Sequence, residues 1–482
     1  MTKRAVVVEA VTGRSMAELV AARDRSRAEL VELRLDGVRD MDVARALAGR
    51  RTPVLVTCRA GWEGGSFDGS EDERLSVLAE AVRLGAEYVD VEWKADRARF
   101  AERGTTKLVI SHHDFAGIPS DLVDRVDAMQ REDADVVKVA VTASRLRDCL
   151  TVKRALDIEK PHVAIAMGAA GQVTRLCPWV FGSEWTYGGT NAPGQASAAE
   201  MIDLYRVPNG SSSTALYAIT GAPLVHSASP AMHNAAFRAL GMDAIYVRLE
   251  TADADEFLEV AEALRVRGVS VTAPLKPGLR NRVGRVDALS EAIGALNTVR
   301  RDDEGWEGRN FDAEGFLTPL RRRRTALSGA RAVIAGAGGT ARMAAWALSR
   351  EGAKVEVAAR RADRAEEVAR EFGVATTAWP PQAGWDLLVN TTPVGTWPHD
   401  AEAPLDRDHV RGGLVYDLIY NPRETTLLTW AREAGAETIG GLEMLVSQAC
   451  LQFEWWTGRS APAALMERAA DAFVRQSREQ MS

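Results

Sequence analysis

Short runs of Val, Ile and Leu recur through residues 1–206, and segments with helical periodicity separate most of them. Nearly continuous apolar strands that alternate with helices are typical of a parallel sheet buried on both faces. The runs cover residues 5–11, 30–36, 53–59, 88–93, 107–115, 135–142, 162–168 and 181–189. About eight such units predict a compact (β/α)₈ barrel, a fold whose active site lies at the C-terminal ends of the strands.

Polar and charged residues occupy the predicted C-terminal ends of these runs. They are Glu32, Arg34, Arg59, Glu63, His112, His113, Lys138, Arg175, Asn191 and Gln195. Alternation of side chains along a strand places Glu32 and Arg34 on one face and directs His112 and His113 to opposite faces. The spacing alone does not decide which of the two histidines enters the barrel.

Lys138 lies inside an otherwise apolar run, Val136-Val137-Lys138-Val139-Ala140. A buried lysine is costly unless it is paired or neutral. Burial and nearby cations lower the pKa of an amine, and a neutral amine is a nucleophile toward a ketone. The alternative is a lysine whose head reaches solvent at the strand end. The neighbouring histidine, glutamate and arginines favour a Schiff-base site.

This half of the chain resembles the type I 3-dehydroquinate dehydratases along its whole length. The similarity is carried by Glu32-x-Arg34, Arg59-x-x-x-Glu63-Gly-Gly, Ser-x-His113-Asp-Phe, Lys138, Arg175 and Ala-Pro-Gly-Gln195. The resemblance implies that Lys138 forms the Schiff base, that His113 is the general acid and base, and that Glu63 orients the imidazole. It also implies substrate contacts by Glu32, Arg34, Arg59, Arg175, Asn191 and Gln195. Asn191 replaces the serine that is usual in the family, and its amide can still bond a hydroxyl.

Residues 207–214, Val-Pro-Asn-Gly-Ser-Ser-Ser-Thr, are short, polar and rich in turn-forming residues. This composition predicts a flexible linker. We therefore expect a barrel over 1–206, a substrate-binding lobe over 215–325 and a nucleotide-binding lobe over 326–440. We expect the closing helices of 441–482 to pack back on the substrate-binding lobe.

The segment from Gly221 to Asn234 follows a predicted strand, and its glycine and prolines indicate a turn that carries Ser227 and Ser229. Such a loop is suited to hydrogen-bonding a small molecule rich in hydroxyls. Three later segments, 268–276, 294–298 and 308–315, each place a polar residue at a strand end. Taken singly, Lys276 or Asp312 is more often a surface charge.

In this order the motifs resemble those of shikimate dehydrogenases, a family with a two-lobed α/β fold. The resemblance implies that Lys276 and Asp312 are the paired acid–base groups. It implies that the substrate is bound by Ser227, Ser229, Thr272, Asn297, Tyr420 and Gln448. Ser270 stands where the family usually has Asn, and Phe311 where it usually has Thr. Both departures leave the charged pair intact and leave the shape of the pocket open.

The cofactor lobe begins with the apolar strand 332–335, followed by Gly336, Ala337, Gly338, Gly339 and Thr340 and then an apolar helix. Strand, glycine-rich turn and helix in this order predict a Rossmann dinucleotide site. The next strand leads to Arg360, Arg361 and Arg364. Arginines where an NAD enzyme has an acidic residue indicate the 2′-phosphate of NADP(H), the alternative being a solvated basic helix start. The family resemblance adds Thr392, Leu418 and Gly441 to the cofactor site.

The leading hypothesis is a fusion enzyme of the shikimate pathway. It dehydrates 3-dehydroquinate to 3-dehydroshikimate and then reduces this product to shikimate with NADPH. The net charge of −7 argues against a general nucleic-acid partner, and no apolar run is long enough for a membrane span. Cys58, Cys149, Cys177 and Cys450 are scattered, which predicts neither zinc nor disulfides and fits a reducing cytoplasm.

The arrangement resembles the bifunctional enzymes of plants, and the lack of a transit segment favours a bacterial, cytoplasmic version. One alternative is a quinate dehydrogenase fused to the dehydratase. A second is a regulator that binds metabolites without turnover, which we would expect to have lost its reactive residues. The sequence makes no prediction of oligomeric state.

Overall fold

The computed structural model describes residues 4–189 and 195–479. The chain divides into two compact units, residues 1–224 with 243–266 and residues 225–242 with 267–482. Residues 215–224 and 243–266 thus group with the barrel in the first unit, and the expected domain boundaries stay a prediction. No helix in the described part of the chain is both long and apolar enough to cross a membrane.

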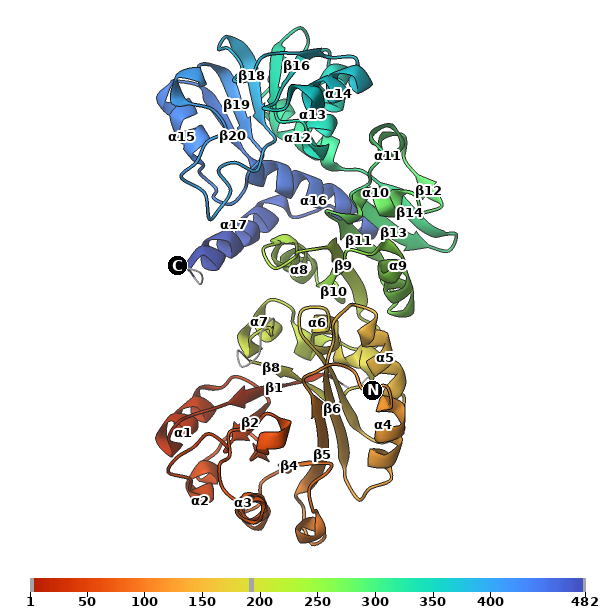
Figure 1. Ribbon diagram of the computed structural model, residues 1–482, viewed down its shortest axis with the longest axis vertical. Coiled ribbons are helices and arrows are strands. Elements are labelled where there is room, and N and C mark those ends of the chain that lie inside the picture. The colour runs from red at the N-terminus through yellow and green to blue at the C-terminus, as the bar shows by residue number, and fades with distance from the viewer. Residues whose placement is uncertain (1–3, 190–194, 480–482) are drawn as a thin grey trace. The chain divides into compact units, whose positions relative to one another are not determined.

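Eight parallel strands form the expected barrel of the first unit, in the order β7-β6-β5-β4-β3-β2-β1-β8 (Figure 1). An isolated parallel bridge from His162 to Ser183 brings the two ends of this sheet together. The strands are Val6–Val11 (β1), Leu30–Arg34 (β2), Val54–Thr57 (β3), Tyr88–Glu92 (β4), Lys107–Asp114 (β5), Val136–Thr142 (β6), His162–Met167 (β7) and Trp185–Gly188 (β8).

Each predicted apolar run contains one strand, so the periodicity identified the barrel correctly. The run 181–189 starts too early, because Pro178–Phe181 forms a 3₁₀ turn that ends at Gly182 with φ of 68°. The barrel interior is filled by apolar side chains such as Val8, Leu55, Val109 and Val163, all fully buried.

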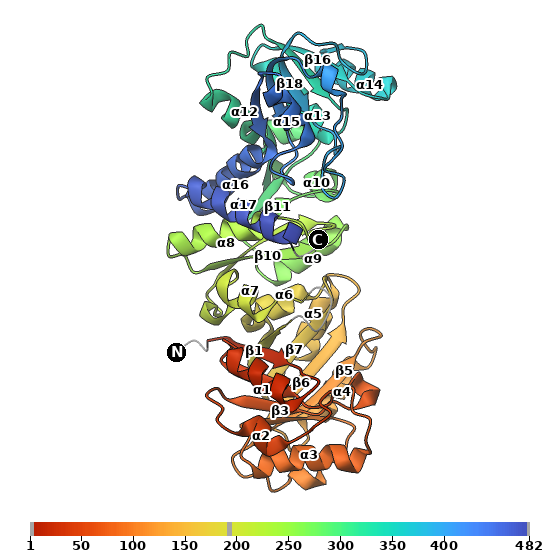
Figure 2. The ribbon, with the colours of Figure 1, turned by 90° about the vertical axis from the view of Figure 1, so that its left-hand side faces the viewer.

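Helices surround the strands of the barrel, as Leu122–Gln130 (α4) and Asp148–Ala155 (α5) do beside β5 and β6 (Figures 1 and 2). They are Met16–Arg25 (α1), Val43–Leu47 (α2), Glu71–Arg83 (α3), Leu122–Gln130 (α4), Asp148–Ala155 (α5), Gln172–Leu176 (α6) and Ala198–Asp203 (α7), with 3₁₀ turns at Gly61–Glu63 (η1), Ala98–Phe100 (η2), Pro178–Phe181 (η3) and Val207–Asn209 (η4). Ser70 begins α3 with a capping box to Glu73, which satisfies otherwise unpaired N–H groups.

The expected linker is more ordered than its composition predicted. Val207 and Pro208 in η4 are buried, and the carbonyl of Pro208 accepts a hydrogen bond from Arg4. Ser213 and Thr214 donate to the carboxylate of Asp243. The polar composition did not reveal these anchoring contacts.

The first unit also contains Ala215–Gly221 (β9), Ala244–Glu250 (β10) and Ala254–Ala263 (α9), with β9 and β10 paired in parallel.

The second unit begins with the elements expected to bind substrate. They are Ser229–Ala239 (α8), Gly268–Val271 (β11), Leu275–Arg280 (α10), Arg285–Val286 (β12), Ala288–Ile293 (α11), Thr298–Asp302 (β13), Gly305–Arg309 (β14) and Asp312–Arg322 (α12). Strand β13 pairs antiparallel with both β11 and β14.

A parallel sheet in the order β17-β16-β15-β18-β19-β20 confirms the Rossmann lobe. Its elements are Arg331–Ala335 (β15), Gly339–Arg350 (α13), Lys354–Ala358 (β16), Ala362–Phe372 (α14), Ala375–Thr376 (β17), Trp385–Asn390 (β18), Arg407–His409 (η5), Gly412–Asp417 (β19), Thr426–Glu433 (α15) and Glu437–Gly440 (β20). The chain closes with Gly441–Thr457 (α16) and Ala463–Glu479 (α17), and α17 packs on α8.

Candidate active sites

Lys138 lies in the middle of β6 with its ammonium group enclosed by the barrel. The residue is only 4% exposed, which rules out the alternative of a head that escapes to solvent. Its Nζ donates to Asp90 Oδ2 at 2.9 Å and lies 3.9 Å from Glu32 Oε1. The ring of Tyr187 on β8 packs against the same nitrogen, with the ring centroid 4.3 Å away.

The protonation of Lys138 differs from the expectation that burial leaves the amine neutral. Burial alone lowers the pKa of Lys138, but the carboxylates of Asp90 and Glu32 outweigh it and hold the pKa above its usual value. The expectation counted the nearby cations and omitted the carboxylate on β4. Lys138 is therefore an ammonium in this arrangement and must lose a proton before it attacks a carbonyl.

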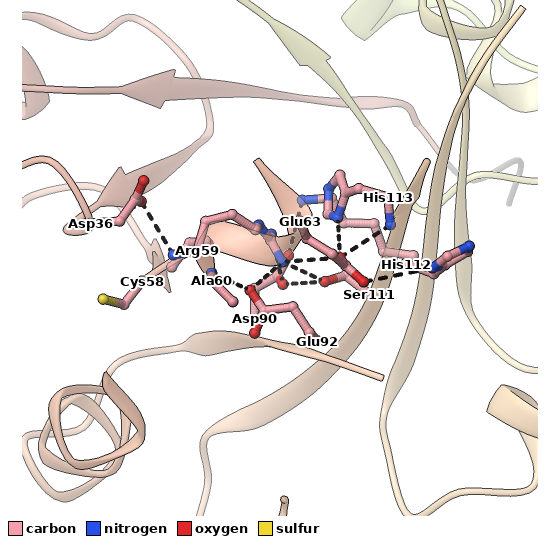
Figure 3. Close-up of polar contacts among 12 residues, drawn as sticks. Asp36, Cys58, Arg59, Ala60, Glu63, Asp90, Glu92, Ser111, His112 and His113 are labelled. Carbon is pink, nitrogen blue, oxygen red and sulfur yellow. Dashed lines mark hydrogen bonds and ion pairs between the residues drawn. The ribbon is translucent and has the colours of Figure 1, made fainter. Parts of the chain in front are cut away.

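Arg59 connects side chains of β4 and β5 in a buried network (Figure 3). Its guanidinium donates to Asp90 Oδ1 at 2.9 Å, Glu92 Oε1 at 3.0 Å and Ser111 Oγ at 2.7 Å. The other oxygen of Glu92 contacts Arg74 of α3 at 2.7 Å. Arg59 is thus committed to the buried network that positions Asp90, and a direct substrate contact remains a prediction.

Glu63 orients both histidines, as Figure 3 shows. Its Oε2 accepts from His113 Nδ1 at 2.9 Å and from the His113 backbone N–H at 3.1 Å, while Oε1 lies 3.6 Å from His112 Nδ1. Burial raises the pKa of Glu63, but the histidine contacts and Arg59 together lower it to about 2. The carboxylate therefore holds the proton of His113 on Nδ1 and leaves Nε2 to accept one.

The pKa of His113 lies at about 4, because burial and the positive charge of Arg59 disfavour the imidazolium. His113 is consequently neutral at physiological pH and suited to act as a general base. His112 shares Glu63 but its Nε2 lies 3.1 Å from Arg125 of α4. This contact with an outer helix shows that His112 points away from the barrel interior, which answers the question that the spacing left open. The role of His113 as the base stays a prediction.

The remaining described barrel residues come from different elements, since Arg34 ends β2, Arg175 lies in α6 and Gln195 follows β8. Arg34 forms a two-point ion pair with Asp36. Arg175 is buried, and one of its nitrogens donates to the Ala166 carbonyl at 3.3 Å, while its Nε has no hydrogen-bond partner among the described residues. Gln195 is half-buried, and Asn191 lies outside the described residues.

Sequence reasoning missed Asp90, Glu92 and Tyr187. The first two alternate with valines in β4, so two carboxylates share one face of an apolar strand. Strands β5 and β6 place Ser111 in register with Lys138, and β4 places Glu92 in register with Ser111. The alternation of acidic and apolar residues was the signal that could have identified Asp90 and Glu92.

In the second unit Lys276 and Asp312 form the expected pair. Lys276 lies in α10 just after β11, and its Nζ donates to Asp312 Oδ2 at 2.6 Å. Asp312 begins α12, where a carboxylate is favoured by the unpaired N–H groups. Asn297 Nδ2 donates to the other carboxylate oxygen at 2.8 Å. Both oxygens are therefore held, which fixes the orientation of the carboxylate.

The other expected substrate ligands come from separate elements. Ser229 is buried at the start of α8, and Ser227 Oγ accepts from its backbone N–H at 3.3 Å. Thr272 follows β11, and Tyr420 follows β19, where burial raises its pKa. Gln448 on α16 donates to the carbonyl of Leu445. A shared substrate contact by these side chains stays a prediction.

The two departures from the family pattern have structural explanations. Ser270 is buried and donates to Gln452 Oε1 of α16 at 2.7 Å. Phe311 packs edge-on against Trp455 with ring centroids 5.7 Å apart, and its backbone N–H donates to Asn297 Oδ1. Ser270 and Phe311 thus contact residues that surround the Lys276–Asp312 pair.

The glycine-rich turn after β15 is shaped for close approach of a ligand. Gly336 has φ of 118°, and a Cβ there would lie 2.4 Å from Thr391 Oγ1. Added Cβ atoms at Gly338 and Gly339 would meet no atom within 4 Å, so the start of α13 is open. This exposed helix N-terminus fits a pyrophosphate.

The remaining predicted cofactor residues differ in their surroundings. Arg360 and Arg361 are exposed at the end of β16, whereas Arg364 pairs with Glu367. Thr392 Oγ1 donates to Asn390 at the end of β18. Gly441 lies so close to Leu418 that a Cβ would be 2.2 Å from its carbonyl oxygen, which gives this pair a packing role.

Family models match the chain along most of its length. Residues 5–212 match type I 3-dehydroquinase, and residues 219–299 match the shikimate dehydrogenase substrate binding domain. Residues 320–381 match shikimate/quinate 5-dehydrogenase, and residues 441–470 match the shikimate 5′-dehydrogenase C-terminal domain.

Individual relatives also match as a dehydratase followed by a dehydrogenase, or as a dehydrogenase over about half of the chain. The chain is 34% identical over 481 residues to the chloroplastic bifunctional 3-dehydroquinate dehydratase/shikimate dehydrogenase of Arabidopsis thaliana. The match covers 91% of this chain and 79% of the relative. It is 44% identical over 275 residues to a shikimate dehydrogenase (NADP(+)) of Anaeromyxobacter sp. strain Fw109-5, covering 54% of this chain and 96% of the relative.

A crystal structure of shikimate 5-dehydrogenase from Thermus thermophilus with NADP(H) and shikimate matches with a TM-score of 0.51 and 36% identity, covering 54% of this chain and 99% of that one. Together with the two sites, these similarities show that the chain belongs to the family of bifunctional type I 3-dehydroquinate dehydratase/shikimate dehydrogenases.

Proposed function

We propose that the two sites catalyse consecutive steps of the shikimate pathway, with Lys138 and Lys276 as the key amines. The chain is a bifunctional enzyme that dehydrates 3-dehydroquinate to 3-dehydroshikimate and reduces 3-dehydroshikimate to shikimate with NADPH. The enclosed Lys138 beside an oriented, neutral His113 is the observation that carries the assignment of the first step.

In the barrel, the Lys138 ammonium transfers a proton to His113 Nε2, and the neutral amine attacks the substrate ketone. His113 then returns this proton to the hydroxyl that leaves the adduct as water. Loss of water from the adduct forms an iminium bond between Lys138 and the substrate carbon, which acidifies the adjacent C–H. His113 Nε2 removes that proton and returns one to the departing hydroxyl, so that water leaves. A second water then hydrolyses the imine and releases the product and the amine.

The substrate carboxylate needs a cation near the lysine. Arg175 supports this role, because its guanidinium is buried and its Nε has no hydrogen-bond partner among the described residues. Burial lowers its pKa to about 10, and it stays charged at neutral pH. A carboxylate would satisfy the free donors with two parallel hydrogen bonds. Glu32, Arg34, Arg59, Asn191 and Gln195 remain our candidates for the other substrate contacts.

Borohydride reduction in the presence of 3-dehydroquinate tests this step. We expect a covalent adduct on Lys138, identified by mass spectrometry of proteolytic peptides. The adduct should be absent from Lys138→Met and present in Lys276→Met. An adduct on another lysine, or none in the wild-type protein, would show that the nucleophile is wrongly assigned.

In the dehydrogenase, Lys276 and Asp312 would supply the proton that the carbonyl oxygen needs when its carbon is reduced. Lys276 donates and Asp312 holds it in place through a short ion pair. Asn297 donates one amide N–H to Asp312, and we propose that its second N–H donates to a substrate hydroxyl. Ser227, Ser229, Thr272, Tyr420 and Gln448 are proposed to bind the other polar groups.

NADPH supplies the hydride when bound. The open backbone at Gly338 and Gly339 and the start of α13 would hold its pyrophosphate. The exposed Arg360 and Arg361 would bind the 2′-phosphate, and Thr392 would lie toward the nicotinamide. Arg364 contributes less in this proposal, because Glu367 already pairs with it.

We infer a preference for shikimate over quinate. The departures from the family pattern at Ser270 and Phe311 are explained by the hydrogen bond from Ser270 to Gln452 and by the packing of Phe311 on Trp455. Comparing kcat/KM for the two substrates with NADP⁺ and NAD⁺ tests this. Higher kcat/KM with quinate and NAD⁺ would favour a role in quinate metabolism.

The four free cysteines support our inference of a cytoplasmic location.

A further inference from the structure

Asp312 lies at the end of a buried chain of hydrogen bonds that starts at Ser270 on β11 and passes through Gln452 of α16. Asn297 contacts the carboxylate directly, and Thr298 Oγ1 donates to Asn297 Oδ1 at 2.7 Å. Gln452 Nε2 donates to Thr298 Oγ1 at 2.8 Å, and Ser270 donates to Gln452 Oε1 at 2.7 Å. The side chains between Ser270 and Asp312 come from β11, α16 and the start of β13.

Backbone groups fix the direction of every bond in this chain. The Phe311 N–H donates to Asn297 Oδ1 at 2.9 Å, so the NH₂ of Asn297 must face Asp312. The backbone carbonyl of Asn297 accepts a hydrogen bond from Gln452 Nε2 at 3.3 Å. The NH₂ of the Gln452 side chain must therefore face Thr298. A peptide N–H and a peptide carbonyl cannot exchange roles.

The hydroxyl of Thr298 has a single consistent arrangement as a result. It accepts from Gln452 and donates its proton to Asn297. Thr298, Asn297 and Gln452 are each at most 2% exposed, so water is a poor substitute for any of these partners. In a buried network each bond polarises the next, and a lost partner leaves a polar group unsatisfied.

We propose that Gln452, Thr298 and Ser270 form a positioning relay that sets the orientation of Asn297 and Asp312 for the reduction. Gln452 and Thr298 do not touch the Lys276–Asp312 pair and act through Asn297. The relay explains why a serine suffices at position 270, since its hydroxyl supplies the donor that Gln452 Oε1 needs. The inference rests on the proposed roles of Lys276 and Asp312.

The test compares Thr298→Val with Thr298→Ser in the full-length enzyme. Valine matches threonine in shape but lacks the hydroxyl, whereas serine keeps the hydroxyl and lacks the methyl. For Thr298→Val we expect kcat for reduction of 3-dehydroshikimate to fall about tenfold, the order expected for a lost buried hydrogen bond. We expect its pH profile to shift, because a less constrained Asp312 changes the ionisation of the pair, and the KM for NADPH to stay the same.

Thr298→Ser should restore kcat to within about threefold of wild type, since the donated bond is kept. Dehydration of 3-dehydroquinate by the barrel is the internal control in each variant and should be unchanged. Gln452→Leu breaks the relay one residue earlier, and we expect a smaller fall in kcat with the same change in pH profile. It also provides the test if Thr298→Val does not fold.

Wild-type kcat and pH profile in both Thr298→Val and Gln452→Leu would overturn the relay. Equal losses in Thr298→Val and Thr298→Ser would overturn it too, because the methyl group would then be the important feature. Failure of the proposed function has a different signature, since the wild-type enzyme would itself not reduce 3-dehydroshikimate.

Discussion

Replacing Asp90 with asparagine tests how the barrel controls the charge of Lys138. The carboxylate lies 2.9 Å from the ammonium nitrogen and is fully buried. At an effective dielectric constant of about 20, two charges at this separation attract each other by roughly 6 kcal/mol. Even a third of that energy corresponds to a pKa change of more than one unit. Asparagine keeps the shape of the side chain and removes the charge.

We expect the pKa of Lys138 to fall below its usual value in Asp90→Asn, because burial and Arg59 then act with less opposition. In the wild-type enzyme the neutral amine is scarce, and its amount rises about tenfold per pH unit. The rate of trapping with cyanoborohydride and 3-dehydroquinate should therefore rise with pH in the wild type. In Asp90→Asn the same profile should level off at a lower pH.

Glu92→Gln is the matched control. Glu92 is also fully buried in β4, but its contacts are with Arg59, Arg74 and the Ala60 backbone N–H. This variant should keep the wild-type pH profile of trapping. Identical profiles in the wild type and Asp90→Asn would refute the conclusion that Asp90 sets the ionisation of Lys138.

Three further changes test other parts of the structure. Replacing Arg360 and Arg361 with alanine should raise the KM for NADPH roughly tenfold or more and leave the KM for NADH unchanged, since each charge-assisted bond contributes about 1.5–3 kcal/mol. An unchanged ratio of the two KM values would remove these arginines from the 2′-phosphate site. Lys276→Met should abolish reduction and leave dehydration intact, and loss of both activities would contradict independent sites. Burial lowers the pKa of His233 to about 3, so its stabilising contribution is present above about pH 6.5 and is lost as the pH falls toward 3. His233→Phe should therefore flatten the decline of the free energy of unfolding between these pH values, and an equally steep decline would exclude His233 as a cause.

The sequence predicted the fold well because both halves carry strong local patterns. The apolar runs defined all eight barrel strands, and the glycine-rich turn between a strand and a helix defined the nucleotide lobe. The family resemblance implied that Lys276 and Asp312 form a pair, and the structure joins them by a 2.6 Å ion pair.

Long-range pairing was harder to predict. The carboxylate of Asp90 reaches Lys138 from 48 positions away, and that contact reverses the expected shift in the pKa of the lysine. Gln452 reaches Thr298 from 154 positions away, so nothing local indicates its role. The anchoring of residues 207–214 was missed for the same reason, since composition does not show which polar side chains find partners.

The most direct measurement is NADPH oxidation by the purified enzyme when 3-dehydroquinate is the only substrate supplied. We predict oxidation by the wild-type chain with formation of shikimate, and none by Lys138→Met until 3-dehydroshikimate is added. Lys276→Met should accumulate 3-dehydroshikimate without oxidising NADPH. Oxidation of NADPH from 3-dehydroquinate by Lys138→Met, or from 3-dehydroshikimate by Lys276→Met at the wild-type rate, would contradict the assignment of the two amines.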